Sequence, residues 1–343
     1  MKEPVTLNLA LQGGGSHGAY TWGVIKRLLG EPWIRIEGIS GTSSGAVNGS
    51  LLACGLSTPG EPEAALDDFW TELGRKFTSI FMPSDELFRF PFMGGSAKNQ
   101  ALEMFLNMTQ SFSPYLFNPD NLNPLRELLQ QSVDFDAIRN NRDIRLFVAA
   151  TNVRTSKLRI FKREELTVDH ILASACLPSV HHPVTIDNET FWDGGFTGNP
   201  SLYPLIFNCR SPDLLIVLLQ PHLRESIPAS PEQIRERIFE IAFQSNFMRE
   251  MRAISFSKQI IGDNVDTMGV LEWRLHELRI HIIHADEDLK DLDNLSRYNA
   301  SPDMLEQLHD AGYRCAGRWL EKNAATLGKA GTTSLESYSD YPL

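Results

Sequence analysis

The sequence predicts an α/β protein in which a mostly parallel sheet is flanked by helices. Two observations carry this prediction. The chain opens with a strand-turn-helix-strand-turn-helix pattern, and short apolar stretches then recur between amphipathic segments along the rest of its length. With 343 residues, of which 42% are hydrophobic and 22% charged, the chain has the composition of an ordinary globular protein and room for one large domain or two smaller ones.

The opening elements follow from periodicity and from turn residues. Apolar side chains alternate with Thr6 and Asn8, which indicates a strand, and Trp22, Ile25 and Leu29 share one face of a helix. A Gly-Glu-Pro break at residues 30–32 ends that helix. The predicted order is a strand at residues 7–12, a helix at 19–29, a strand at 33–40 and a helix to about residue 54.

Later elements complete a single predicted domain over residues 1–323. Strands are expected at 145–151, 158–161, 191–192, 214–220 and 278–284, and amphipathic helices near 231–261 and 302–323. A helical, aromatic-rich insertion is expected at residues 59–133, because residues 77–117 alone hold eight of the 19 phenylalanines. These side chains suit either the core or an apolar lid over a site. Residues 324–343, rich in Gly, Ser and Thr, are expected to form a flexible tail.

Charge and cysteine usage exclude several classes of protein. The net charge of −11 would repel nucleic acid, and the four scattered cysteines include no C-x-x-C pair, so neither a zinc ribbon nor a disulfide framework is indicated. His281 and His284 lie three apart on a predicted strand and so face opposite ways, which disfavours a metal site. We therefore expect no metal and no cofactor. Since no apolar stretch resembles a signal peptide or a membrane span, we expect a cytoplasmic protein.

The first of two glycine-rich turns supports two different functions. Residues 13–18 read Gly-Gly-Gly-Ser-His-Gly between a strand and a helix. As G-x-G-x-x-G, with Glu37 lying 19 residues past Gly18, the turn suits a dinucleotide-binding Rossmann protein. As a run of backbone N–H groups from Gly13, Gly14 and Gly15, the same turn suits an oxyanion hole.

The second turn favours catalysis. Gly41-x-Ser43-x-Gly45 lies between a strand and a helix, which is the context of a nucleophile elbow. A serine hydroxyl needs a base, and Asp193 is the best candidate because it follows a short aromatic strand and precedes the Gly194-Gly195 turn. A Ser-His-Asp triad stays open, since several histidines follow Asp193 in the chain.

In this order the three motifs make the chain resemble the patatin-like phospholipase family, whose signatures are a glycine-rich oxyanion loop, G-x-S-x-G and a later D-G-G or D-G-A. The resemblance spans roughly residues 5–220 and includes the segment 171–184 ahead of the Asp193 strand. It implies a three-layer α/β/α fold and a Ser-Asp dyad that cleaves lipid acyl esters without a histidine or a metal. One residue departs from the family pattern, because His17 stands where an Arg or Lys is usual.

The resemblance also assigns roles to individual residues. Ser43 would be the nucleophile and Asp193 the general base. The oxyanion-hole donors would come from Gly13, Gly14, Gly15 and Ser44, and the supporting glycines would be Gly18, Gly41, Gly45, Gly194 and Gly195. We expect a lipid acyl hydrolase of phospholipase A, lysophospholipase or carboxylesterase type, which meets lipid through apolar residues at a membrane or lipid-body surface. A dinucleotide-binding Rossmann-type protein and a catalytically silent lipid-binding relative are the alternatives.

Overall fold

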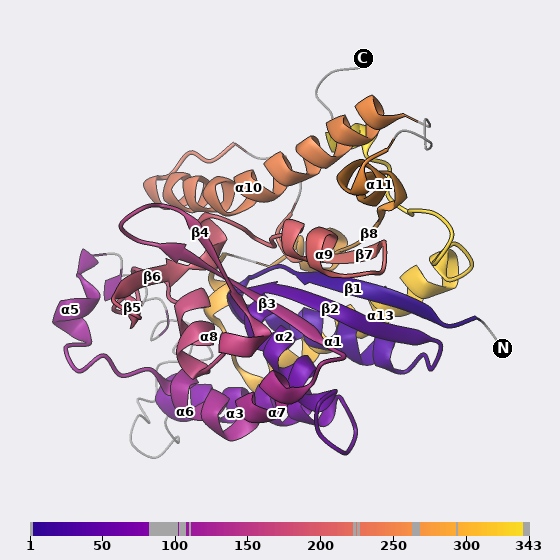
Figure 1. Cartoon of the computed structure of the whole chain (residues 1–343). Helices are drawn as coiled ribbons and strands as arrows, with labels where there is room; N and C mark the ends of the chain where they lie inside the picture. Colours follow the sequence, from indigo (N-terminus) through magenta and orange to yellow (C-terminus); the bar gives the residue numbers. More distant parts are fainter. Residues whose placement is uncertain are drawn as a thin grey trace.

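An eight-stranded mixed sheet runs through the centre of the molecule (Figure 1). The computed structural model describes residues 3–81, 102, 108–109, 111–221, 224, 227–262, 268–292 and 294–338. The sheet order is β5-β6-β3-β2-β1-β7-β8, and β4 pairs with β3. The strands are β1 (Val5–Leu11), β2 (Ile34–Thr42), β3 (Arg145–Asn152), β4 (Leu158–Lys162), β5 (Val184–Ile186), β6 (Glu189–Asp193), β7 (Asp213–Leu218) and β8 (Arg279–His284).

Strands β3, β2, β1, β7 and β8 are parallel, whereas β4, β5 and β6 pair antiparallel. The helices are α1 (Gly18–Leu29), α2 (Ser44–Gly55), α3 (Ala64–Phe81), α5 (Pro114–Phe117), α6 (Pro124–Ser132), α7 (Phe135–Asn140), α8 (Val168–Ser174), α9 (Tyr203–Asn208), α10 (Pro231–Ile261), α11 (Val270–Glu277), α12 (Asp286–Leu289) and α13 (Pro302–Asn323). Short 3-10 turns that matter below are η1 (Gly15–His17), η3 (Gly194–Phe196), η5 (Asn294–Tyr298) and η6 (Glu336–Tyr338).

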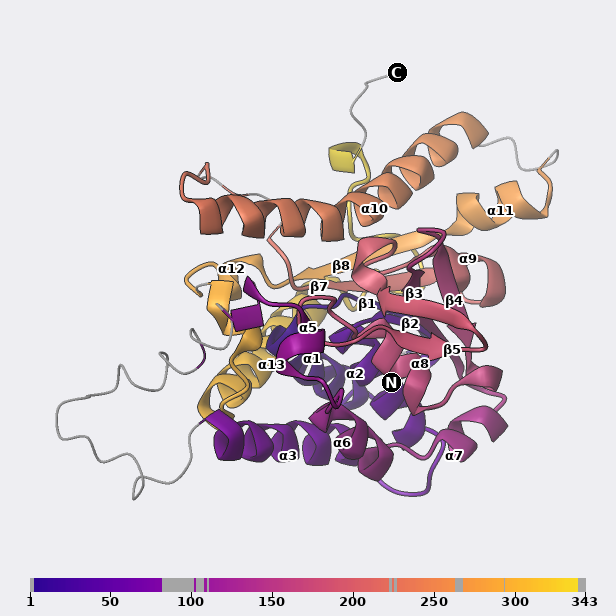
Figure 2. The same ribbon diagram turned by 90° about the vertical axis from the view of Figure 1, so that its left-hand side faces the viewer.

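Helices cover both faces of the sheet, which confirms the three-layer α/β/α prediction. Helices α1, α2, α3, α6 and α13 lie on one side, and α9, α10 and α11 on the other (Figures 1 and 2). Alternate residues of the strands serve the two layers: Leu9 and Leu11 belong to the first core cluster, and Ala10 to the second. Because both faces are buried, β3 and β7 are nearly continuous apolar runs, at residues 146–150 and 214–218.

Strand β3 determines where the C-terminal ends of its neighbours meet. Residues 147–149 pair with both β2 and β4, so these two partners occupy opposite edges of β3. Residues 150–151 pair with both β4 and β6, so β6 lies on the same edge as β2. Thr42 is opposite Ala149, and Asp193 is opposite Ala150. Strand β6 therefore takes the place along β3 that β2 would fill if it continued past Thr42.

Part of the predicted insertion, residues 82–101, 103–107 and 110, lies outside the described residues. Its two flanks are described and belong to the body of the domain. Helix α3 buries Phe69 and Trp70 in the first core cluster, and α6 adds Leu128 and Leu129. None of the described helices combines the length and the apolar character that a bilayer-spanning segment needs.

The C-terminal segment differs from the flexible tail that the composition predicted. Residues 324–338 follow the β8 edge, where the N–H groups of Thr332 and Thr333 donate to the Ile280 carbonyl. Leu327 and Tyr338 are buried in the two core clusters. Glycine and serine content indicated mobility, but two buried apolar anchors and backbone pairing outweigh that tendency. Residues 339–343 lie outside the described part of the chain.

Candidate active site

Ser43 lies at a sharp turn between β2 and α2. Its φ of 55° and ψ of −124° are strained for a residue with a side chain, and strain of this kind is concentrated at functional sites. The flanking glycines permit the turn: a Cβ on Gly41 would lie 2.4 Å from the Gly45 oxygen, and one on Gly45 would lie 2.1 Å from the Leu11 oxygen. The N–H of Ser43 donates to Ser174 Oγ at 2.9 Å, which ties the turn to α8.

The glycine-rich loop after β1 packs directly on this turn. A Cβ on Gly13 would lie 2.7 Å from the Cβ of Ser43, so only glycine allows so close an approach. The Gly13 N–H donates to Asn199 Oδ1 at 2.7 Å, and the Gly14 N–H donates to Ser44 Oγ at 2.9 Å. The structure thus brings both predicted glycine turns together.

Two backbone donors at this point are unused. Within the described part of the chain, neither the N–H of Gly15 nor that of Ser44 has an acceptor. Ser44 is the first residue of α2, so its N–H lies at the positive end of the helix dipole. Of the four residues predicted to form the oxyanion hole, Gly15 and Ser44 have available amides, while those of Gly13 and Gly14 are bonded to side chains.

Asp193 ends β6 beside the Ser43 turn and is completely buried. Its Oδ1 accepts the Gly195 N–H at 2.7 Å. Its Oδ2 has no well-aligned hydrogen bond to any described residue, although the neighbouring Ser43 hydroxyl still favours the charged carboxylate. Burial raises the pKa of Asp193 to about 7, against the lowering effect of the Gly195 N–H and the Ser43 hydroxyl.

The Gly194-Gly195 turn after Asp193 is needed for packing. A Cβ on Gly194 would lie 2.2 Å from the Ala149 oxygen, and one on Gly195 would lie 2.0 Å from the Phe243 ring of α10. Phe243 stacks on Phe239 with ring centroids 4.1 Å apart, and Phe196 of η3 meets both rings edge-on. An aromatic wall, formed by Phe196, Phe239 and Phe243, therefore adjoins the Asp193 turn.

Comparisons with known proteins agree with these motifs. The family described as patatin-like phospholipase matches residues 9–206, which is more than half of the chain. The chain belongs to the patatin-like phospholipase family. This confirms the resemblance inferred from the three motifs, and it supports lipid-hydrolysing activity in general.

Two solved structures are similar to the chain at low identity. VipD from Legionella pneumophila is 15% identical, with a TM-score of 0.42, over 94% of this chain and 67% of that one. ExoU in its heterodimeric complex with SpcU, from the type III secretion system of Pseudomonas aeruginosa, is 15% identical, with a TM-score of 0.30, over 95% of this chain and 76% of that one. No curated protein matches the chain. The family assignment therefore rests on the family match.

His17, the departure from the patatin-like pattern, is held inside the structure. Its Nε2 pairs with Ser296 Oγ of η5 at 2.8 Å. Burial and the neighbouring Arg297 guanidinium lower the pKa of His17 to about 4, so the imidazole is neutral at pH 7. The glycine loop of this patatin-like protein therefore carries no cation of its own.

Four polar residues around Ser43, Asp193 and the glycine loop were not among the site residues predicted from the sequence. Ser174 and Asn199 accept the N–H groups of Ser43 and Gly13, across 131 and 186 residues of chain. Asn48 joins the glycine loop to α3, because its Nδ2 donates to the Gly18 oxygen and its Oδ1 accepts from Trp70 Nε1. Tyr298 of η5 lies near enough to Asp193 for the carboxylate to contribute to its raised pKa, after the larger effect of burial. Only the asparagine before Pro200 carries a local signal, since Asn-Pro favours a turn.

The alternatives left open by the sequence find little support in the geometry. Both oxygens of Glu37 accept backbone N–H groups, from Arg210 and Ser211 at 2.8 Å, at the opposite end of the sheet from the glycine turn. No histidine takes part in the hydrogen bonds of Ser43 or Asp193 within the described residues. His281 is buried within β8, and His284 is exposed at its end.

Among the residues described here, no three His, Cys, Asp or Glu side chains gather closely enough to hold a metal ion.

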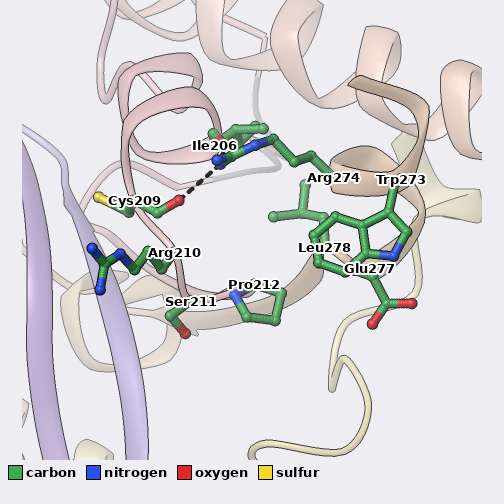
Figure 3. A pocket seen from close by; sticks show the side chains of 9 residues that line it. All are labelled: Ile206, Cys209, Arg210, Ser211, Pro212, Trp273, Arg274, Glu277 and Leu278. Atoms are coloured by element: carbon green, nitrogen blue, oxygen red, sulfur yellow. Dashed lines mark hydrogen bonds between the residues drawn. The ribbon is translucent and has the colours of Figure 1, made fainter. Parts of the chain in front are cut away.

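A cavity between α9, α11 and the start of β7 lies at the N-terminal ends of the parallel strands, away from Ser43 (Figure 3). Of the two arginines that line it, Arg274 donates to the carbonyls of Ile206 and Cys209, at 2.9 and 2.8 Å. These carbonyls lie at the C-terminal end of α9, where they have no partner within the helix. The Arg274 guanidinium therefore stabilises the C-terminal end of α9.

Proposed function

We propose that the protein is a serine acyl hydrolase that cleaves carboxylic esters of lipids, with Ser43 as nucleophile and Asp193 as general base. One observation carries the proposal: a buried carboxylate whose pKa is raised to about 7 lies at the sheet position next to a strained serine. A base with a pKa near 7 is unprotonated often enough to accept a hydroxyl proton, yet basic enough to hold it.

The residues support a two-step reaction. Asp193 Oδ2 takes the proton from Ser43 Oγ as that oxygen attacks the ester carbonyl carbon. The oxygen of the tetrahedral intermediate accepts hydrogen bonds from the unused N–H groups of Gly15 and Ser44, and Gly14 can join them if its N–H leaves Ser44 Oγ. The C–O bond to the leaving alcohol then breaks, and the alcohol oxygen receives the proton from Asp193. Water, deprotonated by Asp193, resolves the acyl-enzyme in the same way.

The aromatic wall favours a hydrophobic acyl group. Phe243 is 4% exposed and contacts the turn that carries Asp193, while Phe239 lies one helical turn earlier on α10. An acyl chain that extended from Ser43 along this wall would bury apolar surface at about 25 cal/mol per Å². Phospholipids, lysophospholipids and neutral esters all offer such chains.

Covalent labelling combined with hydrolysis tests the proposal. The wild-type chain should react with a fluorophosphonate and hydrolyse p-nitrophenyl acyl esters, while Ser43→Ala should fold, fail to label and lose turnover. Ser50→Ala is the matched control, because Ser50 is buried on the same helix and its hydroxyl donates to the Val47 carbonyl. A folded wild-type chain that neither labels nor turns over would instead be a silent lipid-binding relative.

A further inference from the structure

A cluster of three arginines lies beside the candidate active site and is only partly neutralised. Arg224 Nη2 and Arg297 Nη2 both reach Glu240 Oε1, at 2.7 and 3.2 Å, and Arg237 Nη1 reaches Glu240 Oε2 at 3.1 Å. The Glu240 side chain is 4% exposed, so the three arginines share a buried carboxylate. Among the described residues, the three guanidiniums are therefore bonded to one carboxylate, that of Glu240. A second carboxylate, Glu236, lies close enough to act on Tyr298 of η5.

Short contacts connect this cluster to the glycine loop. The turn η5 carries Arg297, whose carbonyl oxygen is where a Cβ on Gly15 would clash, at 2.3 Å. Ser296 of the same turn forms a hydrogen bond with His17. The charge of Asp193 contributes, after burial, to the raised pKa of Tyr298, which ends the turn. The cluster thus borders the glycine loop through η5.

A small cavity opens between the arginines and the glycine loop. Its polar lining includes Gly14, His17, Arg224 and Arg297, and its apolar lining includes Leu219 and Leu289. The side chains of Arg224 and Arg297 are 29% and 16% exposed, so both guanidiniums are accessible from this side. The cavity therefore joins a cationic surface to the edge of the oxyanion loop.

Most of the hydrogen-bond donors of the two arginines are unused. A guanidinium has five N–H donors. Arg224 and Arg297 each donate one hydrogen bond to Glu240 and make no other hydrogen bond with described residues. His17 is neutral and adds no charge to the cavity. A guanidinium with unused N–H donors binds the oxygens of a phosphate group more strongly than the oxygen of an uncharged alcohol.

We propose that Arg224 and Arg297 form a subsite for the phosphate group of the ester substrate. The inference rests on the proposed function and narrows its substrate class to phosphorylated glycerol esters. The phosphate would lie in the small cavity against Gly14, while the ester carbonyl, a few bonds away, lies at Ser43. Glu240 holds the two guanidiniums in place from behind.

A pair of substrates that differ only in the phosphate tests this proposal. We expect kcat/KM for 1-palmitoylglycerol 3-phosphate to exceed that for 1-palmitoylglycerol. In Arg297→Gln the ratio of the two values should fall by about tenfold or more, chiefly through KM, because a charged hydrogen-bond donor is lost. Arg224→Gln should act in the same direction, and it provides an independent test if Arg297→Gln does not fold. Arg75→Gln is the control, since that guanidinium is 70% exposed and pairs with Glu72. An unchanged ratio in the folded Arg297 or Arg224 variant would overturn the subsite.

Binding to an inactive variant separates this proposal from the catalytic one. Ser43→Ala should bind glycerol 3-phosphate by calorimetry, with an affinity that falls with salt and falls further in Ser43→Ala/Arg297→Gln. If Ser43→Ala still hydrolyses esters, the proposed function fails, while this titration still tests the anion site. If inorganic phosphate binds as tightly as glycerol 3-phosphate and the substrate ratio does not respond to either variant, the site takes free phosphate and the headgroup assignment is wrong.

Discussion

Asp193 and Asp213 are both buried aspartates of the central sheet, but they have opposite surroundings. Asp193 lies past the C-terminal end of β2 and has one protein N–H on Oδ1 and no aligned partner on Oδ2 among the described residues. Asp213 begins β7 at the other end of the sheet. It accepts from Arg279, from His281 at 3.1 Å and from the Gly328 N–H at 3.0 Å.

The pKa values of the two carboxyl groups move in opposite directions. Burial raises the pKa of Asp193 to about 7, because its few hydrogen bonds do not compensate for lost hydration. Burial also acts on Asp213, but hydrogen bonds from His281 and Arg279 outweigh it and lower the pKa. A fully partnered carboxylate stabilises the fold, whereas an under-partnered one is costly and chemically available.

Replacement of Asp193 should have the largest effect, on activity. Asp193→Asn keeps the shape but removes the base, so kcat should fall on the order of 1000-fold, or about 4 kcal/mol in activation free energy. Steady-state hydrolysis of a p-nitrophenyl acyl ester, with circular dichroism to confirm folding, measures this. Retention of kcat within about tenfold would remove Asp193 from the mechanism.

Replacement of Asp213 should instead affect stability. Asp213→Asn leaves Arg279 without its carboxylate and loses the charged partner of buried His281, so the free energy of unfolding should fall by about 3 kcal/mol. Urea denaturation at pH 7 gives the value, and the folded variant should keep its kcat. Asp136→Asn is the control, because Asp136 is 82% exposed beside Arg139 and should change stability little. A small loss at Asp213 would contradict the comparison.

The same difference predicts opposite dependences of stability on pH. The pKa of Asp193 is higher in the folded state than in the unfolded chain, so its contribution to stability decreases as pH rises from about 4 to about 7. Asp193→Asn should therefore gain stability relative to wild type between pH 4 and pH 8, by a few kcal/mol at most. Asp213 acts the other way, because its pKa is lower in the folded state than in the unfolded chain. The stability that it contributes is present at pH values above the unfolded-state pKa and is lost as the pH falls through the folded-state pKa. If the free energies of unfolding of wild type and Asp193→Asn ran parallel from pH 4 to pH 8, the raised pKa of Asp193 would be refuted.

A second buried acid sharpens the assignment of the pH profile. Burial also raises the pKa of Glu250 to about 7, but its Oε2 accepts the Leu202 N–H at 2.7 Å at the start of α9. We expect kcat/KM to rise with pH through an apparent pKa near 7 that belongs to Asp193. Glu250→Gln should leave that midpoint within about half a pH unit. A larger shift would assign the profile to Glu250.

Local patterns were sufficient to predict much of the fold and the candidate site. Helices α10 and α13 begin and end at the residues expected from periodicity, because each is preceded by a serine and starts at a proline. The Ser43 turn and the glycine loop could be located because each depends on glycines at fixed spacing. The tail at residues 324–338 could not, since its order comes from pairing with β8 and from two buried anchors.

The sequence by itself determined the fold class, the family and the residue types available for chemistry, because these depend on periodicity and on motifs a few residues long. Only the tertiary structure decided that β6 replaces β2 along the edge of β3, which brings Asp193 next to Ser43 across 150 residues of chain. It also placed Asn199 and Ser174 against these two turns, and Arg224, Arg237 and Arg297 beside the glycine loop. Such ordinary polar residues have no local signal, since their role depends on distance in space and on burial, and both are set by how the strands pair.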